Sequence, residues 1–469
     1  MDNARDMVDV REMVVLHKLR LTGPTSAIEG LYNGPFWYYL LAIPFVLTSG
    51  NPYGSIILEI ILWFMGGAFL LKLVSRWGNY LILPIGALWV SSNYVVLTNL
   101  YAFNPNPVIL LTPVFIYCLV EYLKEGKLGW AVLSWFLAGL FFNFEMNFGV
   151  FTPVIILASL LLTKKFKLLK TTGFWLGVAA FILTLTPQIL FDIKHHFIMS
   201  KSVLRFLSES PSSNFDFPLR LRSISESFFN TFSATLMNHK TFTLIIFGLF
   251  VLTCKQIKKD HLLLISFLTI SIPFLAYLFL PVTVNAWHLG GEMAAGIIIL
   301  GFILKKFKLF SIPISFLIIF FALSNIANFF LHDFGKTNSD PSLYRNEIAA
   351  IDYVYKYANG RNFKVYTYLP SVYDYPYQYL FWWYGNKKYS YVPGEYAYAP
   401  QKPPYIPSQD KFEGRKDNFS GLVFLIKEPN RNYTRFGWEG DFIKYNWQPI
   451  EKQMVGPIEV EIRKETNKL

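Results

Sequence analysis

The chain carries few charges and almost no cysteine. Only 16% of its 469 residues are charged and two are cysteine, whereas 53% are hydrophobic and 18% aromatic. The two cysteines, Cys118 and Cys254, lie far apart inside apolar segments, which excludes a disulfide framework and a cysteine-based zinc site. So much apolar surface is typical of an integral membrane protein rather than of a water-soluble domain.

The familiar motifs of soluble enzymes are missing as well. The sequence contains no P-loop, no GxGxxG after a strand, no HExxH and no GxSxG, so no recognisable nucleotide-binding loop is in use. A net charge of +12 would suit nucleic acid, but most clustered Lys and Arg residues lie in short loops between apolar runs. We therefore expect no nucleic-acid partner.

The apolar runs predict an all-α polytopic membrane domain of about ten transmembrane helices plus interfacial helices, because most approach the roughly 20 residues that a span requires. They lie at 54–72, 81–97, 107–123, 129–143, 147–163, 172–191, 241–254, 262–281, 288–304 and 311–331. The count carries an error of about one or two, since boundaries drawn from one sequence drift. The two segments that meet at Asn143 and Asn147 are alternatively one broken helix.

Basic residues occupy alternate loops between these segments. These are Lys72, Arg76, Lys124, Lys127, Lys164, Lys165, Lys167, Lys170, Lys255, Lys258, Lys259, Lys305, Lys306 and Lys308. The intervening loops at 98–106, 144–146 and 282–287 have no Lys or Arg. By the positive-inside rule the basic loops face the cytoplasm, so residues 1–53, the 192–240 loop and the chain beyond about 332 are extracytoplasmic.

The first 53 residues are rich in charge, yet no apolar stretch precedes them to carry them across a membrane. We therefore expect one more span upstream of Met1 in the natural chain. Segment 36–48 is apolar but short, and its Trp37, Tyr38 and Tyr39 suit a helix that lies at the outer membrane interface.

Beyond about 332 the pattern changes to that of a small α/β domain. Residues 345–358 have the spacing of a helix, while FKVYTYL at 363, GLVFLIK at 421 and IEVEI at 458 indicate strands. The predicted organisation is an outer-face loop (1–53), a polytopic domain (54–331) and an extracytoplasmic domain (332–469). For the many Tyr and Trp residues between Tyr366 and Tyr405, packing against the membrane domain is favoured over stacking on sugars.

The N-terminal segment presents acidic residues on one helix face. Asp2, Asp6 and Asp9 follow i, i+4, i+7, and Arg5 lies three residues from Asp2 and four from Asp9. Such a helix would hold carboxylates around a guanidinium at the membrane surface. The alternative is an ordinary solvated face with i,i+4 pairs.

Further candidates lie in the outer loops. Glycines and a proline predict a tight turn that presents Tyr32 and Asn33 beside the interfacial aromatic segment. Asn104 opens the span at 107 together with Pro105, Asn106 and Pro107. Glu145 is an ionisable group in an almost uncharged turn, where a functional role is a fair default because an unpaired charge at that depth is costly.

Two more clusters follow later outer helix ends. Cations after the span at 172–191 would suit a lipid phosphate or simple anchoring: Lys194, His195, His196, Lys201 and Arg205. His288 and Glu292 lie at i, i+4, but two ligands do not make a metal site.

The order of these motifs resembles the GT-C class of membrane glycosyltransferases. It runs from Asp2 with Arg5, through GLYNGPFWYYLLAIPF and the NPNP helix start at 104, to LTPQILFDIKHHF at 185. Within the class, the sequence is most similar to the branch that contains the protein O-mannosyltransferases and the lipid A aminoarabinose transferases. The resemblance covers about residues 1–331.

The resemblance implies a hexosyl- or pentosyltransferase. Such enzymes move a sugar from a polyprenyl-phosphate donor to a lipid, glycan or protein acceptor on the extracytoplasmic face, usually with inversion, and Asp2 stands at the position of the catalytic carboxylate. The chemistry agrees, because an acceptor hydroxyl needs a base and a departing phosphate needs nearby cations. Donor-phosphate or substrate candidates are Arg5, Asp6, Tyr32, Asn33, Tyr38, Asn104, Glu145, Lys194, His195, His196, Arg205, His288 and Glu292.

The sequence departs from that family at three places. Asn33 stands in the loop where aminoarabinose transferases carry a lysine, and Asn104 to Pro107 lack the acidic residue of those relatives. A divalent metal between two outer acids is therefore unsupported, and no cofactor is assigned. Without a preceding span, Asp2 has no evident anchor.

A polytopic transporter or a non-catalytic envelope-glycan assembly protein is the alternative. The sequence shows no pair of related halves with glycine-broken helices, as transporters often do, and its large outer domain favours an enzyme.

Overall fold

The computed structural model of the chain divides into two compact units. The helical unit is Leu19–Phe334, and the sheet unit joins Met1–Lys18 to Gly335–Leu469. The N-terminal segment therefore groups with the C-terminal region, whereas the sequence predicts residues 1–53 to form one outer-face loop. The structure describes residues 2–92, 95–96, 98, 101–209, 216–333, 339–371, 373–400, 405–429 and 434–465.

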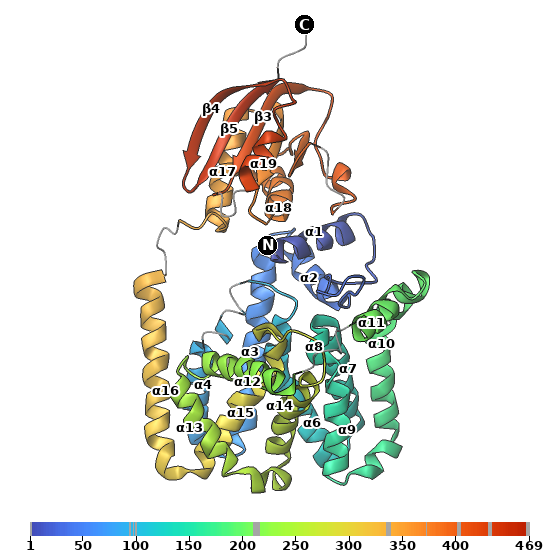
Figure 1. The fold of residues 1–469 in the computed structure, drawn as a ribbon, viewed down its shortest axis with the longest axis vertical. Coiled ribbons are helices and arrows are strands. Elements are labelled where there is room, and N and C mark those ends of the chain that lie inside the picture. Colours follow the sequence, from blue (N-terminus) through green and yellow to red (C-terminus); the bar gives the residue numbers. More distant parts are fainter. Residues whose placement is uncertain are drawn as a thin grey trace. The chain divides into compact units, whose positions relative to one another are not determined.

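The helical unit consists of helices joined by short turns (Figure 1). Its α-helices are α2 Phe36–Leu47, α3 Tyr53–Ser75, α4 Ile82–Ser91, α6 Asn106–Glu125, α7 Leu128–Phe144, α8 Met146–Gly149, α9 Thr152–Leu162, α10 Thr172–Lys194, α11 Ile198–Glu209, α12 Phe217–Thr235, α13 Lys240–Val251, α14 His261–Tyr277, α15 Gly290–Lys306 and α16 Lys308–Asn328. Shorter 3-10 turns are η1 Asn79–Leu81, η2 Phe166–Lys170, η4 Cys254–Lys259 and η5 Ala286–Leu289, and a π-turn, η6, covers Phe329–Asp333.

Each predicted apolar segment contains a helix. Within the described residues, five helical stretches are long and apolar enough to cross a membrane, or up to six with the pair α12 and α13, which is bent by 106°. The five are Tyr53–Ser75, Asn106–Glu125, Thr172–Lys194, Ala286–Lys306 and Lys308–His332. Residues 93, 94 and 97 of the predicted 81–97 span lie outside the described residues. The multi-pass helical character is confirmed, while the count of ten spans stays a prediction.

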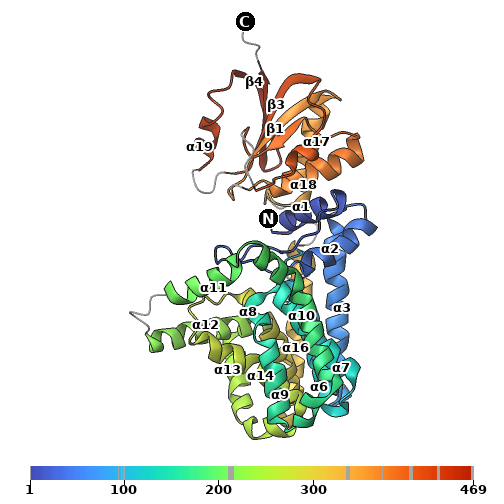
Figure 2. The same cartoon turned by 90° about the vertical axis from the view of Figure 1, so that its right-hand side faces the viewer.

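Burial separates inner from outer helices in this unit. The spanning windows of α6 and η5–α15 are 94% and 89% buried, whereas those of α10 and α16 are each 22% buried. A helix that is apolar all round and still exposed needs an apolar surrounding, which the hydrocarbon of a bilayer supplies. Most of the long helices run roughly parallel, while α12 lies across them (Figures 1 and 2).

The sheet unit is an α/β fold around a five-stranded mixed sheet of order β2-β1-β3-β5-β4. Strand β1 pairs in parallel with β2 and β3, while β5 pairs antiparallel with β3 and β4. Its elements are α1 Asp2–Val15, α17 Tyr344–Ala358, β1 Asn362–Tyr368, α18 Tyr375–Tyr384, η7 Gly385–Tyr389, β2 Glu395–Ala397, η8 Gln409–Lys411, β3 Phe419–Lys427, α19 Thr434–Gly440, β4 Trp447–Val455 and β5 Ile458–Glu465. The predicted helix at 345–358 and the three predicted strands are confirmed.

Alternation along β1 divides its side chains between the two faces of the sheet. Phe363 meets the ring of Tyr355 from α17 at 5.3 Å between centroids, edge to face. Tyr366 lies on the opposite face and stacks on Trp447 at 5.6 Å. Figure 2 shows the same division, with α17 and α18 on one side of the sheet and α19 on the other.

The crowded tyrosines and tryptophans form the sheet unit's own core. Tyr366, Tyr368, Tyr377 and Tyr396 are each no more than 1% exposed, and Tyr366 and Tyr368 pack with Trp438 and other residues in one cluster. The expected packing against the membrane domain is therefore wrong for these four side chains. Their burial also leaves them unable to stack on a sugar.

Glu347 of α17 is a buried carboxyl in this unit. Burial and the nearby Glu428 carboxylate raise its pKa from about 4.5 to about 8. The folded protein therefore keeps a proton that the unfolded chain loses above about pH 4.5. The stabilisation that results from the raised pKa of Glu347 is fully present below about pH 4.5, and it is lost as the pH rises towards 8.

Replacing Glu347 by Gln is expected to remove this pH dependence. Relative to the parent, the variant gains up to about 1.4 kcal/mol of unfolding free energy per pH unit between about pH 4.5 and 8. Hydrogen exchange of the β1 and β3 amides in the full chain measures the difference. The exposed Asp417→Asn serves as control, and a parent and E347Q pair that respond alike to pH would contradict the assignment.

Candidate active site

The acidic N-terminal segment is the helix that the sequence predicts, α1, and the expected pair of Arg5 with Asp2 is present. Arg5 contacts the Asp2 carboxylate at 3.1 Å and donates two hydrogen bonds, of 2.8 and 2.9 Å, to Oδ1 of Asp6. Asp6 is fully buried, whereas the Asp2 side chain is 48% exposed. Of these two carboxylates, Asp2 is therefore the one open to a ligand, and Arg5 fixes its direction.

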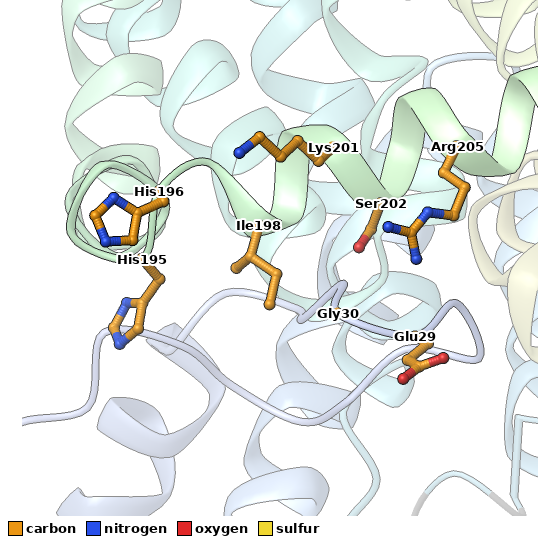
Figure 3. A pocket seen from close by; sticks show the side chains of 8 residues that line it. All are labelled: Glu29, Gly30, His195, His196, Ile198, Lys201, Ser202 and Arg205. Carbon is orange, nitrogen blue, oxygen red and sulfur yellow. The ribbon is translucent and has the colours of Figure 1, made fainter.

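A pocket of about 260 Å³ lies in the helical unit where α10 turns into α11 (Figure 3). It brings together several of the predicted cations with residues of the loop before α2. The lining residues are Glu29, Gly30, His195, His196, Ile198, Lys201, Ser202 and Arg205. Lys194 is exposed and does not line the pocket. The result is a predominantly basic hollow with one carboxylate on its rim.

The turn between the two helices is held by Asp192. Its carboxylate accepts the backbone N–H of Met199 at 2.7 Å and the hydroxyl of Ser200 at 2.5 Å. His196 and Phe197 adopt positive φ angles of 56° and 61°, which reverse the chain direction within two residues. Asp192 therefore acts as a structural cap that orients α11, and its negative charge does not line the pocket.

His195 is held in place by aromatic contacts. Its ring stacks on Phe191 at 4.0 Å between centroids, and Phe191 in turn meets the ring of Tyr32 edge to face at 5.5 Å. Gln188 donates to the Tyr32 carbonyl at 3.1 Å. Tyr32 is thus a support for the pocket through Phe191 and not one of its lining residues.

Gly30 permits the loop to approach α11. Its φ is +77°, and a Cβ at this position would collide with the Ser202 hydroxyl. Glycine is needed both for the left-handed backbone and for the close contact. The tight turn predicted from glycines is therefore confirmed at Gly30.

Asn33 and Tyr38 are placed away from the pocket. The backbone of Asn33 pairs with Pro24 and Gly23, so the residue closes a turn, and the side chain is largely buried. Tyr38 is buried within α2 at 2% exposure. Neither side chain lines the basic pocket.

Glu145 sits at a break between helices. Its backbone is extended at the end of α7, and its Oε1 accepts both the backbone N–H of Asn147 at 3.1 Å and the side-chain amide at 2.7 Å. Asn104 donates to the neighbouring Phe144 carbonyl at 2.7 Å, and the hydroxyl of Tyr277 donates to the Asn147 carbonyl at 2.9 Å. The predicted outer turns therefore meet here. Where the sequence left open one broken helix, the structure has three helices, α7, α8 and α9.

His288 and Glu292 do not combine into a metal pair. The Nδ1 of His288 accepts the Asn285 backbone N–H at 3.3 Å, which caps η5. Glu292 is fully buried, and its carboxylate oxygens have no hydrogen-bond partner within the described residues. Among those residues, no three His, Cys, Asp or Glu side chains come together as metal ligands.

The sequence did not single out three residues that the structure brings forward. Glu29 and Ser202 line the pocket, and Glu59 on α3 is fully buried with both carboxylate oxygens unpartnered in the described part of the chain. Glu59 carries the same signal as Glu145, a single acid in an apolar segment. Glu29 lies in a loop that already held candidates, but nothing in its spacing points to α11.

Comparison with known proteins identifies the fold. No family model matches the chain, and no curated protein matches it. The structure is similar to that of ArnT from Cupriavidus metallidurans bound to undecaprenyl phosphate, with a TM-score of 0.59 at 11% identity over 98% of this chain and 93% of that chain. The apo structure of the same protein gives 10% identity with the same TM-score and coverage. The GT-C fold that the sequence predicts is therefore confirmed.

Substituting Gly30 by Ala is expected to destabilise the loop. The left-handed φ alone costs about 1–2 kcal/mol with a Cβ, and the collision with Ser202 adds to it. Gly360→Ala is the matched control, because Gly360 has φ +76° but no atom within 4 Å of the place where a Cβ would lie. Thermal unfolding of the purified protein should show the larger loss for Gly30→Ala, with part of it recovered in the double variant with Ser202→Ala. Equal losses at the two glycines would show that the contact is unimportant.

Proposed function

We propose that the chain is a membrane glycosyltransferase that takes a sugar from a polyprenyl-phosphate donor. It transfers the sugar, with inversion, to an acceptor on the extracytoplasmic face. The observation that carries the proposal is the basic pocket at the end of α10. The ArnT-like fold, seen in one crystal structure with undecaprenyl phosphate, supports the same substrate class.

The pocket suits the phosphate of a membrane lipid. Helix α10, Thr172–Lys194, is long and apolar enough to cross a membrane, and its outward side chains include Leu183, Leu190 and Ile193. The pocket begins at the residue after this helix, so it lies where a lipid headgroup would lie if α10 spans the bilayer. His195, His196, Lys201 and Arg205 supply donors for the phosphate oxygens. A phosphate held this way is also a better leaving group, because its developing charge is balanced.

Asp2 is the proposed catalytic base. Arg5 orients the half-exposed Asp2 carboxylate, and the exposed part of that carboxylate is open to an acceptor hydroxyl. A hydroxyl is a poor nucleophile near neutral pH, and a positioned carboxylate that removes its proton accelerates attack on the sugar carbon. The sugar–phosphate bond breaks as the new glycosidic bond forms, and the lipid phosphate leaves with the bonding electrons. Glu145 is a second candidate acid, held by Asn147.

Replacing Arg205 by Gln is expected to weaken binding of undecaprenyl phosphate about tenfold to a hundredfold. A hydrogen bond from a charged group contributes about 1.5–3 kcal/mol, and each 1.4 kcal/mol is tenfold in affinity. The measurement is the Kd of the purified full chain for undecaprenyl phosphate, with undecaprenol as the lipid lacking the phosphate. Lys194→Gln is the matched control, because this neighbouring cation is outside the pocket. Equal affinity for the two lipids would contradict the phosphate site.

Asp2→Asn is expected to lower kcat by about a hundredfold to ten-thousandfold, with the KM for the donor little changed. The assay is sugar transfer in membranes from undecaprenyl-phosphate sugars, after envelope lipids and glycans with and without the gene have indicated which sugar to use. Equal expression of parent and variant is the control. Unchanged turnover would remove Asp2 from the role, and Glu145→Gln in the same assay tests the second acid. A transporter or assembly protein would give no transferred product from the parent.

A further inference from the structure

The helix that carries Asp2 buries several of its residues, and the arginine among them contacts the C-terminal domain. Arg11 of α1 is fully buried, and its guanidinium carbon lies 3.8 Å from the centre of the Phe412 ring and 5.5 Å from that of Trp382. Its Nη1 also lies 3.4 Å from the Gln378 carbonyl, in hydrogen-bond geometry. These partners are more than 360 residues away along the chain, in the same compact unit.

This arginine is an unusual choice for a structural contact. Its Nε and Nη2 have no hydrogen-bond partner within the described residues, and burial lowers its pKa. Ring faces and the Gln378 carbonyl surround the charge, and the Tyr396 hydroxyl and the Glu12 carboxylate offset part of the effect of burial. Burying a charge in this way is costly, and an apolar side chain of similar volume would serve stability as well or better. Unlike an apolar side chain, a guanidinium has a fixed direction in this site, because the rings and the carbonyl together constrain its plane.

The surface that receives Arg11 is rigid. The side-chain amide of Gln378 donates to Asp374 Oδ2 and to the Tyr396 carbonyl, each at 2.8 Å. Tyr396 in turn donates its hydroxyl to the carbonyl of Phe412 at 3.0 Å. The residues that contact the guanidinium are therefore tied to one another by buried hydrogen bonds. Because these residues hold one another in place, the helix that contacts them through Arg11 is held in place as well.

A second contact fixes the end of the same segment. The Lys18 ammonium donates to the Ser408 hydroxyl at 3.0 Å, close to where the segment leaves the unit. Arg11 lies nine residues beyond Asp2 on one helix, which corresponds to about 13 Å along its axis. Because an α-helix is stiff over that length, fixing Arg11 also fixes Asp2 and Arg5.

We propose that Arg11 is a positioning residue, and that through it the C-terminal domain sets the place and direction of the carboxylate Asp2. The domain then holds the helix that carries the proposed base, and is not an accessory. This inference rests on the proposed role of Asp2 as the base.

The test compares Arg11→Met, Arg11→Lys and Phe412→Leu with the exposed Val15→Ala of the same helix as control. Phe412→Leu leaves the arginine in place and removes its ring, so it reports on the contact even if Arg11→Met folds poorly. Two quantities are measured on the full chain in membranes or nanodiscs. They are hydrogen exchange of the amides of residues 2–15, and kcat and KM for an undecaprenyl-phosphate sugar.

Exchange over residues 2–15 is expected to become about tenfold or more faster in Arg11→Met and Phe412→Leu. The kcat should fall about tenfold to a hundredfold while the donor KM stays within about twofold, because displacing a base by 1 Å is enough for such a loss. Arg11→Lys should recover part of both effects, and Val15→Ala should resemble the parent.

Other results overturn the inference. Unchanged exchange in Arg11→Met and Phe412→Leu would show that Arg11 does not fasten the helix. Faster exchange with unchanged kcat would show that fastening has no catalytic consequence. If the parent transfers no sugar, the proposed function fails and the positioning role with it, whereas the exchange data still decide whether Arg11 anchors α1.

Discussion

The helical unit depends on one constraint: a polar group inside an apolar bundle is costly unless it finds a partner within the protein, since hydrocarbon offers none. Along the helices this is met by the backbone itself. Polar side chains then gather where helices break. Asn104 satisfies the Phe144 carbonyl, and Glu145 satisfies the amides at the start of α8. The breaks are thus both the weak points of the bundle and the places where chemistry is possible, so the candidate site residues of this unit cluster there.

The same constraint gives a different outcome in the sheet unit. Its core contains a buried cation that is paired with carboxylates. The Lys427 ammonium lies 2.8 Å from Glu439 and 2.5 Å from Glu461. Lys427 and Arg463 outweigh the effect of burial and hold the pKa of Glu461 at about 2. Arg11 is the contrasting case, a buried cation among rings. The comparison matters, because a compensated network stabilises a fold whereas an arginine held by ring faces mainly specifies a direction.

The sequence pattern predicted the helix at 345–358, whose apolar residues recur with helical spacing, and the strands β1, β3 and β5, which are short runs rich in apolar, β-branched and aromatic residues. It failed for β4, Trp447–Val455, because an edge strand with exposed side chains and a proline has no apolar alternation to detect. It also failed for β2, which has three residues.

The candidate site was predictable in parts. The basic run after α10 is contiguous, so its clustering followed from the sequence, and four of its cations do line one pocket. Glu29 was not predictable, since a loop and a helix about 170 residues apart meet only in the fold. The same limit applies to Arg11, whose partners lie beyond residue 370.

Within the pocket, the mixture of charges has a chemical consequence. Four cationic or potentially cationic side chains without a counter-charge would hold any phosphate too firmly, the spent carrier included. Glu29 on the rim reduces the net positive charge that the lipid phosphate meets. Under the proposed function, this lower positive charge lets the cations aid departure of the phosphate without trapping it.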